Sequence, residues 1–441
     1  MDTKKTGLQV GYAKVNITPD YSVGLGGYSN AETRRSEGVA APIFTTCIAF
    51  RDGEETVLLF TFDKCGISRI QCELIRESVC PATGIPFEKV FIGATHTHSA
   101  PDFTKDEAGR RYRQEFLDAA VEAAQAALAD LTPARVEATT TALHNMNFVR
   151  HYVTADGTYA GSNFGVISKE NPAVGHILEP DPTLMLVKFV REGKKDVLLV
   201  NWGAHPDKSR DIGFHLLAPS FPGPMRDRLE ELTGDHVAYF TAASGDQVAS
   251  SRVEEIKKDL IIPWVEYGQQ LADMAFAALP GLKPVEGEGI RTCRRIATVN
   301  VDHSWDPMIE QANEVYDLWK SVGKEEGDAL GKTYGFTSSY QARAIRSRYN
   351  MEKTAQVELN AFRVGGIGFT TGTYEMFGAS GKAVRDGSPY DFTFLVTGNS
   401  GYIPSEAAFN YRCYEADTGM FAKGTAEQLV EEYIDMLGQV K

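Results

Sequence analysis

The sequence predicts an α/β (α+β) fold in which layered β-sheets are flanked by helices. Short apolar, β-rich runs alternate with segments of helical periodicity along the 441 residues. No Pro/Ser-rich linker, low-complexity tract or internal repeat interrupts this alternation, which favours a single layered domain over residues 1–441. With 43% hydrophobic and 24% charged residues, the chain also has ample material for a large core.

The first elements form a hairpin followed by helices and a strand. The runs CIAFRDG and TVLLFTFDKCG meet at Asp52-Gly53, a dipeptide typical of a hairpin turn. Residues 70–79 have helical spacing, and residues 89–94 form a continuous apolar strand. The most regular helical pattern lies at residues 112–131, where apolar residues recur on one face.

The remaining elements continue this alternation to the end of the chain. We expect helices at 223–232, 264–279 and 425–437, and strands at 136–143, 184–189, 197–202, 236–241, 356–364, 367–371 and 392–397. A polar, charge-rich stretch with helical periodicity interrupts them and predicts a helical excursion at about 305–353. This stretch either covers the mouth of a site or forms a solvated helical hairpin.

Charge and composition exclude several classes of protein. A net charge of −14, with acidic and basic residues mixed throughout, argues against nucleic acid as a partner. The N-terminus has no apolar signal segment, and no run approaches the ~20 apolar residues that span a bilayer. The six cysteines form no CxxC pair, which argues against a disulfide framework or a cysteine zinc ribbon. We therefore expect a cytoplasmic protein without an integral membrane segment, either alone or as a homo-oligomer.

Histidines follow two of the apolar strands. In VFIGATHTHSAP, His96 and His98 stand two residues apart, so on extended backbone they would project from one face. In VLLVNWGAHPDKS, His205 follows a second strand, and open α/β sheets commonly place their sites at the carboxyl ends of strands. Two such histidines would need a carboxylate to complete a zinc site. Equally, the pair could be a polar strand end and His205 a loop histidine.

Short motifs spread over residues ~10 to ~435 have a common resemblance. They are GYAKVNITP, GLGGY, GATHTHSAP, EPDPTLMLVKF, NWGAHP, SFPGPMRDRLE, AASGD, TYEMFGASG and GYIPSEAAFNYRCYE. In this order they resemble the catalytic domain of the neutral/alkaline, non-lysosomal ceramidase family, of which the chain would be a divergent member. The family's C-terminal immunoglobulin-like domain is not expected here, because the sequence ends near the close of the catalytic domain.

The resemblance implies a zinc site and names its ligands. His96 falls on the first histidine of the THTH motif and His205 on the histidine of NWxAH. Glu375 falls on the glutamate of a PGExF motif, although the usual Pro-Gly is absent, and Tyr402 on the tyrosine of a GYxxT-like segment. A phenolate is an uncommon zinc ligand, and its ordinary pKa of ~10 must drop on binding.

The resemblance also implies three residues that act on the substrate. His98 would move a proton or hold the substrate, Arg150 of NFVR would grip an oxyanion, and Tyr414 of YRCYE would lie near the scissile carbonyl. From the residues alone, Arg150 could be a surface ion pair, and Tyr402 and Tyr414 ordinary half-buried aromatics.

One family position differs. Where the family's GDxSP segment has a serine, this chain has Val248, and an apolar side chain can neither attack a carbonyl nor donate to a carboxylate. Ser244, Ser250 and Ser251 are close in sequence, but a shift of register would be needed. Metal-activated water does not need this serine.

The leading hypothesis is a zinc-dependent hydrolase that cleaves an amide, or a related C–N or ester bond, in a small soluble substrate. One alternative is an amidohydrolase-type metal barrel, which predicts eight βα units with the histidine pair near the first strand. Another is a metal-containing binding protein that kept the scaffold and lost catalysis along with the serine.

Overall fold

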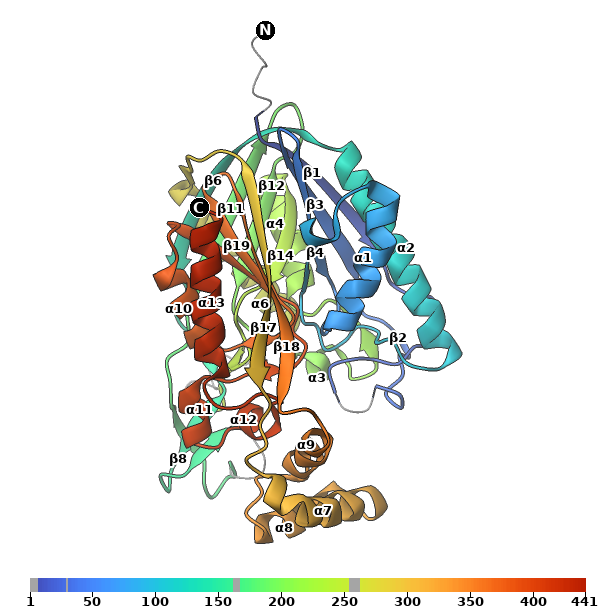
Figure 1. Cartoon of the computed structure of the whole chain (residues 1–441), viewed down its shortest axis with the longest axis vertical. Helices are drawn as coiled ribbons and strands as arrows, with labels where there is room; N and C mark the ends of the chain where they lie inside the picture. The colour runs from blue at the N-terminus through green and yellow to red at the C-terminus, as the bar shows by residue number, and fades with distance from the viewer. Residues whose placement is uncertain (1–6, 29–30, 162–166, 254–261) are drawn as a thin grey trace.

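Two β-sheets pack face to face, and helices cover the outer face of each sheet (Figure 1). The computed structural model of the chain describes residues 7–28, 31–161, 167–253 and 262–441, so residues 1–6 of the N-terminal segment lie outside the described residues. The predicted fold class, layered sheets flanked by helices, is confirmed.

The larger sheet has nine strands, in the order β14-β12-β11-β6-β1-β3-β4-β5, with β16 beside β6. Only the β4–β5 and β12–β14 pairs are parallel. A barrel of eight βα units would need parallel strands throughout, so the amidohydrolase-type alternative is wrong. The strands are β1 (Gln9–Asn16), β3 (Phe44–Asp52), β4 (Glu55–Phe62), β5 (Val90–Ala94), β6 (Thr132–Ala142), β11 (Thr183–Arg191), β12 (Val197–Trp202), β14 (His236–Thr241) and β16 (Lys283–Pro284).

The smaller sheet consists of β17 (Ile290–Asn300), β18 (Thr354–Val364), β19 (Ile367–Gly372) and β21 (Phe392–Thr397), in that order. Its inner face meets the larger sheet through aromatic rings, such as Phe91 and Phe362, which stack at 4.0 Å between ring centroids. Strand alternation sends every second side chain into this shared core and the others outward to the helices.

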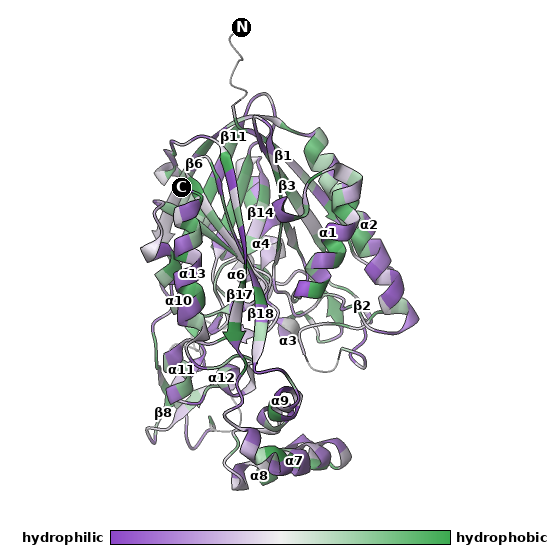
Figure 2. Ribbon diagram, in the orientation of Figure 1, coloured by the Kyte–Doolittle hydropathy of each residue, from purple (hydrophilic) through white to green (hydrophobic). Residues whose placement is uncertain are grey.

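Three pairs of helices cover the outer faces. Helices α1 (Arg69–Thr83) and α2 (Glu107–Ala129) pack on one half of the larger sheet, and α4 (Pro222–Thr233) and α6 (Trp264–Ala278) on the other half. Helices α10 (Gly378–Gly387) and α13 (Thr425–Gln439) cover the smaller sheet. Apolar residues line the strands and the inward sides of these helices (Figure 2).

The polar stretch at about 305–353 holds a small helical cluster at one end of the molecule (Figure 1). After the short turn η3 (Asp306–Met308) come α7 (Ile309–Ser321), α8 (Lys324–Thr333) and α9 (Ser339–Tyr349). This cluster has a core of its own, made by Ala312, Val315, Phe336, Ala342 and Ile345. Helix α9 lies against α12 (Tyr414–Thr418), which belongs to the main body.

Short elements connect these layers. They are β2 (Gly38–Val39), η1 (Phe87–Lys89), β7 (Phe148–Val149), β8 (His151–Thr154), β9 (Tyr159–Gly161), β10 (Ala173–His176), α3 (Ser209–Ile212), β13 (Leu216–Leu217), β15 (Gln247–Val248), η2 (Leu279–Gly281), β20 (Glu375–Met376), β22 (Tyr402–Ile403) and α11 (Glu406–Asn410).

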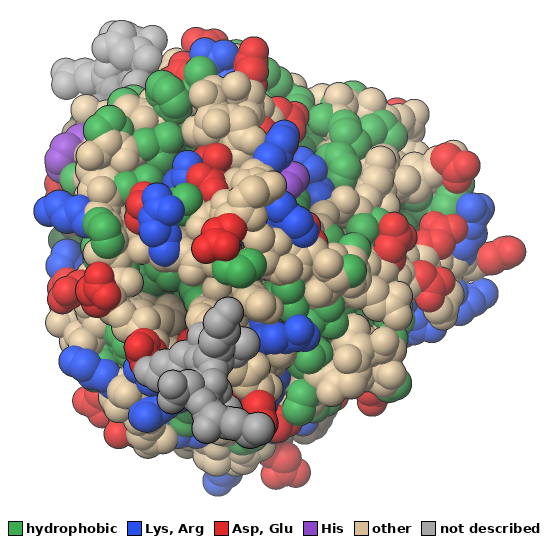
Figure 3. All heavy atoms as spheres, turned by 90° about the horizontal axis from the view of Figure 1, so that it is seen from above, with side chains coloured by type: hydrophobic (Ala, Val, Ile, Leu, Met, Phe, Trp, Pro, Cys, Tyr) green, Lys and Arg blue, Asp and Glu red, His purple; other side chains and the backbone are tan. Residues whose placement is uncertain are grey.

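The surface carries charges of both signs. On the face drawn in Figure 3, Lys and Arg side chains are interspersed with Asp and Glu. Within the described ranges, none of the helices combines the length and the apolar character needed to cross a bilayer.

Candidate metal centre and catalytic site

The candidate site lies where strands of both sheets end. The segments that carry His96, His205, Glu375 and Tyr402 follow the carboxyl ends of β5, β12, β19 and β21, respectively. The first two strands belong to the larger sheet and the last two to the smaller one. The site is therefore assembled between the sheets, at the end of the strands where α/β folds commonly bind ligands.

Buried polar side chains hold the two sheets together at this end. Asn201 of β12 donates to the Leu395 carbonyl of β21 at 2.7 Å and accepts from the Leu395 N–H at 3.2 Å. The Thr397 hydroxyl donates to the Thr241 carbonyl at 3.0 Å, and the Thr241 hydroxyl donates to the Thr95 carbonyl at 2.8 Å. These bonds fix the loops that follow the strands, and hence the relative positions of the site residues.

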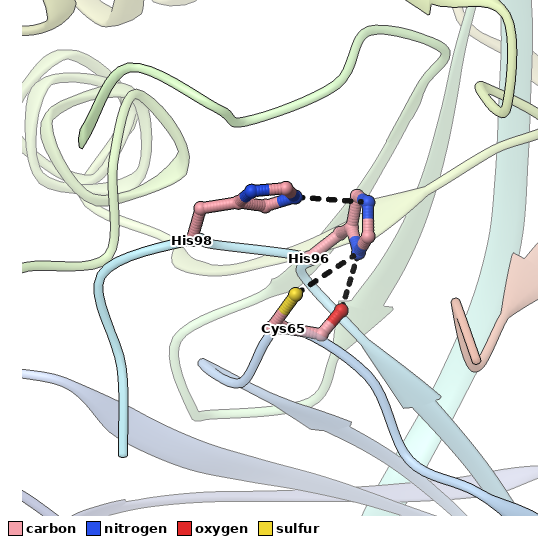
Figure 4. Close-up of side chains that lie close together, drawn as sticks. All are labelled: Cys65, His96 and His98. Carbon is pink, nitrogen blue, oxygen red and sulfur yellow. Dashed lines mark hydrogen bonds between the residues drawn. The ribbon is translucent and has the colours of Figure 1, made fainter. Parts of the chain in front are cut away.

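His96 and His98 converge for a different reason than the sequence indicated. Strand β5 ends at Ala94, and His96 has a left-handed backbone conformation with φ of 67°. The prediction that both histidines lie on extended backbone is wrong, because a turn rather than strand alternation brings the rings to 4.9 Å between centroids (Figure 4). A left-handed backbone costs an L residue roughly 1–2 kcal/mol, so the surrounding structure must hold it there.

Three acceptor atoms of buried side chains aim at one point. His96 Nε2 lies 2.7 Å from His205 Nε2 and 3.4 Å from Glu375 Oε2, and the His205 Nε2 to Glu375 Oε2 distance is 3.9 Å. Ligands ~2.0–2.1 Å from a tetrahedral zinc ion lie roughly 3.3 Å apart. Apart from the two imidazoles, no donor among the described residues reaches Glu375 Oε2. These three residues form a group that could hold a metal ion.

The hydrogen-bond partner of Nδ1 fixes the tautomer of His96 and of His205. His96 Nδ1 donates to the Cys65 carbonyl in a short contact and has the Cys65 sulfur 3.9 Å away (Figure 4). His205 Nδ1 faces the Ser244 carbonyl at 3.2 Å. Because a carbonyl only accepts, the hydrogen of each neutral ring sits on Nδ1 and the Nε2 lone pair is left for a cation.

The three histidine rings have different pKa values. Burial by itself would lower the pKa of His96, but the Glu375 carboxylate and Cys65 outweigh it and raise this pKa well above its ordinary value. Burial and the charge on His96 lower the pKa of His205 and of His98 well below the usual range. Of the three rings, His96 therefore binds a proton most readily, because its Nε2 lies 3.4 Å from the Glu375 carboxylate.

Tyr402 and Arg150 lie beside this group. Tyr402 of β22 is the register partner of Glu375 in a short parallel pair. Burial and the Glu375 carboxylate raise the pKa of its phenol well above the usual value, although Arg150 opposes them. The Arg150 Nη2 donates to the Tyr402 hydroxyl at 3.1 Å and to the Gly245 carbonyl at 2.8 Å. The structure thus brings Tyr402 next to Glu375 and aims the arginine at its hydroxyl.

His98 and Tyr414 complete the group of residues expected from the sequence. His98 Nε2 lies 3.4 Å from His96 Nε2, and the backbone N–H of His98 donates to the Pro206 carbonyl at 3.3 Å. The ring of Tyr414, at the start of α12, lies 6.0 Å from that of Tyr402. All seven residues therefore belong to one region of the molecule.

Sequence reasoning did not identify the residues that hold Arg150 in place. Arg150 Nε donates to Glu415 Oε1 at 2.7 Å, and His151 Nε2 lies 3.0 Å from Glu415 Oε2. The opposite ring nitrogen of His151 contacts the Tyr411 hydroxyl at 3.1 Å. Glu415 is fully buried although it is charged, and a buried carboxylate needs such partners. Glu415 is the last residue of the YRCYE motif, which was the one signal in the sequence that could have drawn attention to it.

Val248, at the serine position of the family motif, lies next to His205. The two residues form an isolated parallel bridge, and Val248 is buried in β15. Ser251 does not take over the missing hydroxyl, because its Oγ is engaged with His176 Nε2 at 2.8 Å and with the Val253 N–H.

Solved structures with the same architecture exist. The crystal structure of the neutral ceramidase from Pseudomonas aeruginosa matches over 98% of this chain and 74% of that chain, with 15% sequence identity and a TM-score of 0.71. The chain has the neutral ceramidase fold. A ceramidase complexed with C2 matches over 98% of this chain and 75% of the other, with 15% identity and a TM-score of 0.68. No protein-family model matches the sequence. No curated protein matches it either. An identity this low establishes the ceramidase-like fold and no more.

Proposed function

We propose that this protein is a zinc-dependent hydrolase that cleaves an amide, or a related C–N or ester bond, of a small soluble substrate. The observation that carries the proposal is the convergence of His96, His205 and Glu375 at one buried point, with both imidazoles oriented by carbonyl groups. Similarity to two structures named as ceramidases supports an amide as the bond that is cleaved.

In this proposal, His96, His205, Glu375 and Tyr402 hold the metal ion. The three nitrogen and carboxylate ligands are a usual set for a catalytic zinc site. Tyr402, in the strand that pairs with Glu375, supplies an oxygen as the fourth ligand. A bound zinc ion supplies Lewis acidity, which polarises a carbonyl group and lets water act as a nucleophile near neutral pH.

The other residues handle protons and charge. The oxygen of water adds to the carbonyl carbon and the C–N bond breaks, so one proton must move from the water to the departing nitrogen. His98, beside His96, is placed to carry that proton. Arg150 and Tyr414 would stabilise the charge that develops on the carbonyl oxygen.

A second candidate function follows from Val248. Because this residue replaces the serine of the family motif, the scaffold could bind a metal and a ligand without turning the ligand over. A catalytic zinc site keeps an open position, whereas a structural site is closed by protein ligands. Turnover of any amide by the purified protein would therefore exclude this candidate.

Metal content and hydrolysis together test the proposal. We expect the purified protein to contain about one zinc ion per chain and to cleave members of a panel of N-acyl compounds, lactams and lactones. His205→Ala and Glu375→Ala should lose both properties, while His303→Ala, at a histidine that pairs with Asp306 near the helical cluster, should keep both. A protein that binds no zinc, with variants indistinguishable from it, would sink the proposal. A cytoplasmic location and a homo-oligomeric state stay predictions, which cell fractionation and light scattering would test.

A further inference from the structure

Helix α9 carries three arginines, and two of them are paired. Arg346 lies 3.2 Å from the Asp317 carboxylate, and Arg348 lies 3.4 Å from Asp302. Arg343 differs from both, because no carboxylate in the described part of the chain lies within ion-pair distance of its guanidinium. Half-buried cations normally have such a partner, so the unpaired Arg343 calls for an explanation.

Aromatic rings hold the Arg343 side chain in place. Its guanidinium lies 5.3 Å from the centroid of Tyr340 and 5.9 Å from that of Trp319. These two rings meet edge to face at 5.1 Å. An aromatic face attracts a cation but takes none of its charge-assisted hydrogen bonds, so the N–H groups of Arg343 remain available to an anion.

A single aromatic ring, that of Tyr340, lies between the Arg343 guanidinium and Tyr414 of the candidate site. The Tyr340 ring lies 6.1 Å from that of Tyr414, which in turn lies 6.0 Å from that of Tyr402. The charge of Arg343 also reaches Tyr414, since burial raises the pKa of this phenol while Arg343 and Arg150 oppose the rise. Only the ring of Tyr340 thus separates Arg343 from Tyr414, a residue expected to contact the substrate.

The position of α9 is fixed by contacts with the main body. The Thr337 hydroxyl donates to Asp417 Oδ2 at 2.7 Å, and Arg348 donates to the Gly419 carbonyl in a short contact. Arg412, which precedes α12, donates to the Gln341 side chain at 3.2 Å. Figure 1 shows α9 beside α12, between the main body and helices α7 and α8. The cation is therefore presented by a docked helix rather than by a free surface side chain.

We propose that Arg343 binds a carboxylate on the substrate, so that the enzyme acts on amides that carry a carboxylate away from the scissile bond. The planar fork of a guanidinium matches a carboxylate through two parallel hydrogen bonds. A substrate with only a neutral chain would cover Arg343 and leave it unpaired, which is unfavourable. The inference rests on the proposed function, because it assigns the substrate class to the same site.

Matched substrates test this inference. A series of p-nitroanilides with increasing acyl length is made in two forms, one ending in a carboxylate and one in a methyl group. We expect the wild-type protein to favour the carboxylate form at one or more lengths by roughly tenfold or more in kcat/KM. Arg343→Gln should remove this preference by slowing the carboxylate form alone, and Arg343→Lys should restore part of it. Arg346→Gln, the same change on the same helix, should keep the preference.

Each outcome decides the question. Turnover without a preference for the carboxylate form, or a preference that Arg343→Gln leaves unchanged, would overturn the inference. If no anilide is cleaved, the broader substrate panel and the zinc content decide the hydrolase function, and calorimetric binding of glutarate and longer dicarboxylates tests the anion site alone. Binding that Arg343→Gln abolishes and Arg346→Gln keeps would support the site, and no binding by the wild-type protein would overturn it. Circular dichroism of each variant separates loss of binding from loss of folding.

Discussion

Two buried arginine–glutamate pairs have the same nitrogen–oxygen distance and different surroundings. Arg76 of α1 lies 2.7 Å from Glu358 of β18, and Arg150 lies 2.7 Å from Glu415 of α12. The Glu358 carboxylate also accepts from Arg294 and Asn360, both in the smaller sheet. Arg150, by contrast, uses its remaining N–H groups on Gly245 and on Tyr402, next to the candidate metal ligands.

The comparison shows that burial of a charge pair does not by itself indicate a function. Both pairs have to offset the cost of removing charges from water, and both do so through additional hydrogen bonds. The difference lies in where the other donors of the arginine point. The Arg76 pair joins a helix to a sheet, whereas the Arg150 pair holds a cation against the Tyr402 hydroxyl. We therefore expect substitutions at the first pair to change stability and those at the second to change turnover.

The largest effect should come from replacing each arginine by lysine. Lysine keeps the charge but lacks the fork that reaches several acceptors at once. Arg150→Lys should lower kcat/KM by roughly 10²- to 10³-fold, the usual cost of losing a donor that stabilises an oxyanion. Arg76→Lys should leave kcat/KM of the folded protein within about twofold, since Arg76 contacts no residue of the site. Equal losses of activity in both variants would remove the distinction between the pairs.

The next effect is on stability and depends on pH. Burial would raise the pKa of Glu358, but hydrogen bonds from Arg76 and Arg294 outweigh it and lower this pKa from 4.5 to about 2. A lowered folded-state pKa stabilises the protein above pH 4.5, and this stabilisation is lost as the pH falls from 4.5 toward 2. Its size is about 3 kcal/mol. Glu358→Gln should therefore lower the free energy of unfolding at neutral pH and flatten its fall in this acid range.

Denaturant unfolding across this pH range measures the effect. The same substitution at Glu73, which pairs with Arg69 on the surface of α1, serves as the control and should cost roughly 0.3–0.5 kcal/mol. If Glu358→Gln and Glu73→Gln gave parallel pH profiles, the Arg76–Glu358 pair would not be a source of acid sensitivity.

A smaller effect on kcat is expected at His151, which contacts the glutamate partner of Arg150. Because a carboxylate only accepts, His151 donates from Nε2 to Glu415, and this bond helps to keep Glu415 in position. His151→Phe removes the donor and should lower kcat by roughly tenfold with little change in KM. His151→Gln keeps an N–H donor near the same place and should recover most of the loss. A rise in KM without a change in kcat, or no recovery of kcat in His151→Gln, would contradict a positioning role.

Much of this fold could be predicted from local sequence. The turn at Asp52-Gly53 does join β3 and β4, the helical pattern at 70–79 lies within α1, and the pattern at 112–131 overlaps α2 up to its end at Ala129. Strands β1 and β17 were missed. The charged residues of β17 explain the second miss, since Arg295 is paired with Glu432 and Asp435 of α13, far away in sequence.

The candidate site was accessible to sequence reasoning only in part. His96 and His205 are visible because each follows an apolar strand, but the left-handed turn at His96 has no local signal such as glycine. The partnership of Arg150 with Glu415 joins positions 265 residues apart. Spacing along the chain cannot indicate a bond of this kind, because it depends on how separate layers of the fold pack.

The smallest effect should come from the outermost residue of the Arg150 chain of contacts. The Tyr411 hydroxyl donates to His151 Nδ1 at 3.1 Å, and Tyr411 lies four contacts from Tyr402. Tyr411→Phe removes one neutral hydrogen bond and should lower the free energy of unfolding by roughly 0.5–1.5 kcal/mol and kcat/KM by no more than about threefold. The outer partner of the other pair is Arg294, which is about one-third exposed and lies 2.7 Å from Glu358. Arg294→Gln should cost up to ~1 kcal/mol of stability and leave kcat/KM unchanged. A chain of positioning contacts requires that the loss of kcat/KM become smaller from Arg150 through His151 to Tyr411. A loss in Tyr411→Phe as large as in Arg150→Lys would instead mean that Tyr411 itself contacts the substrate.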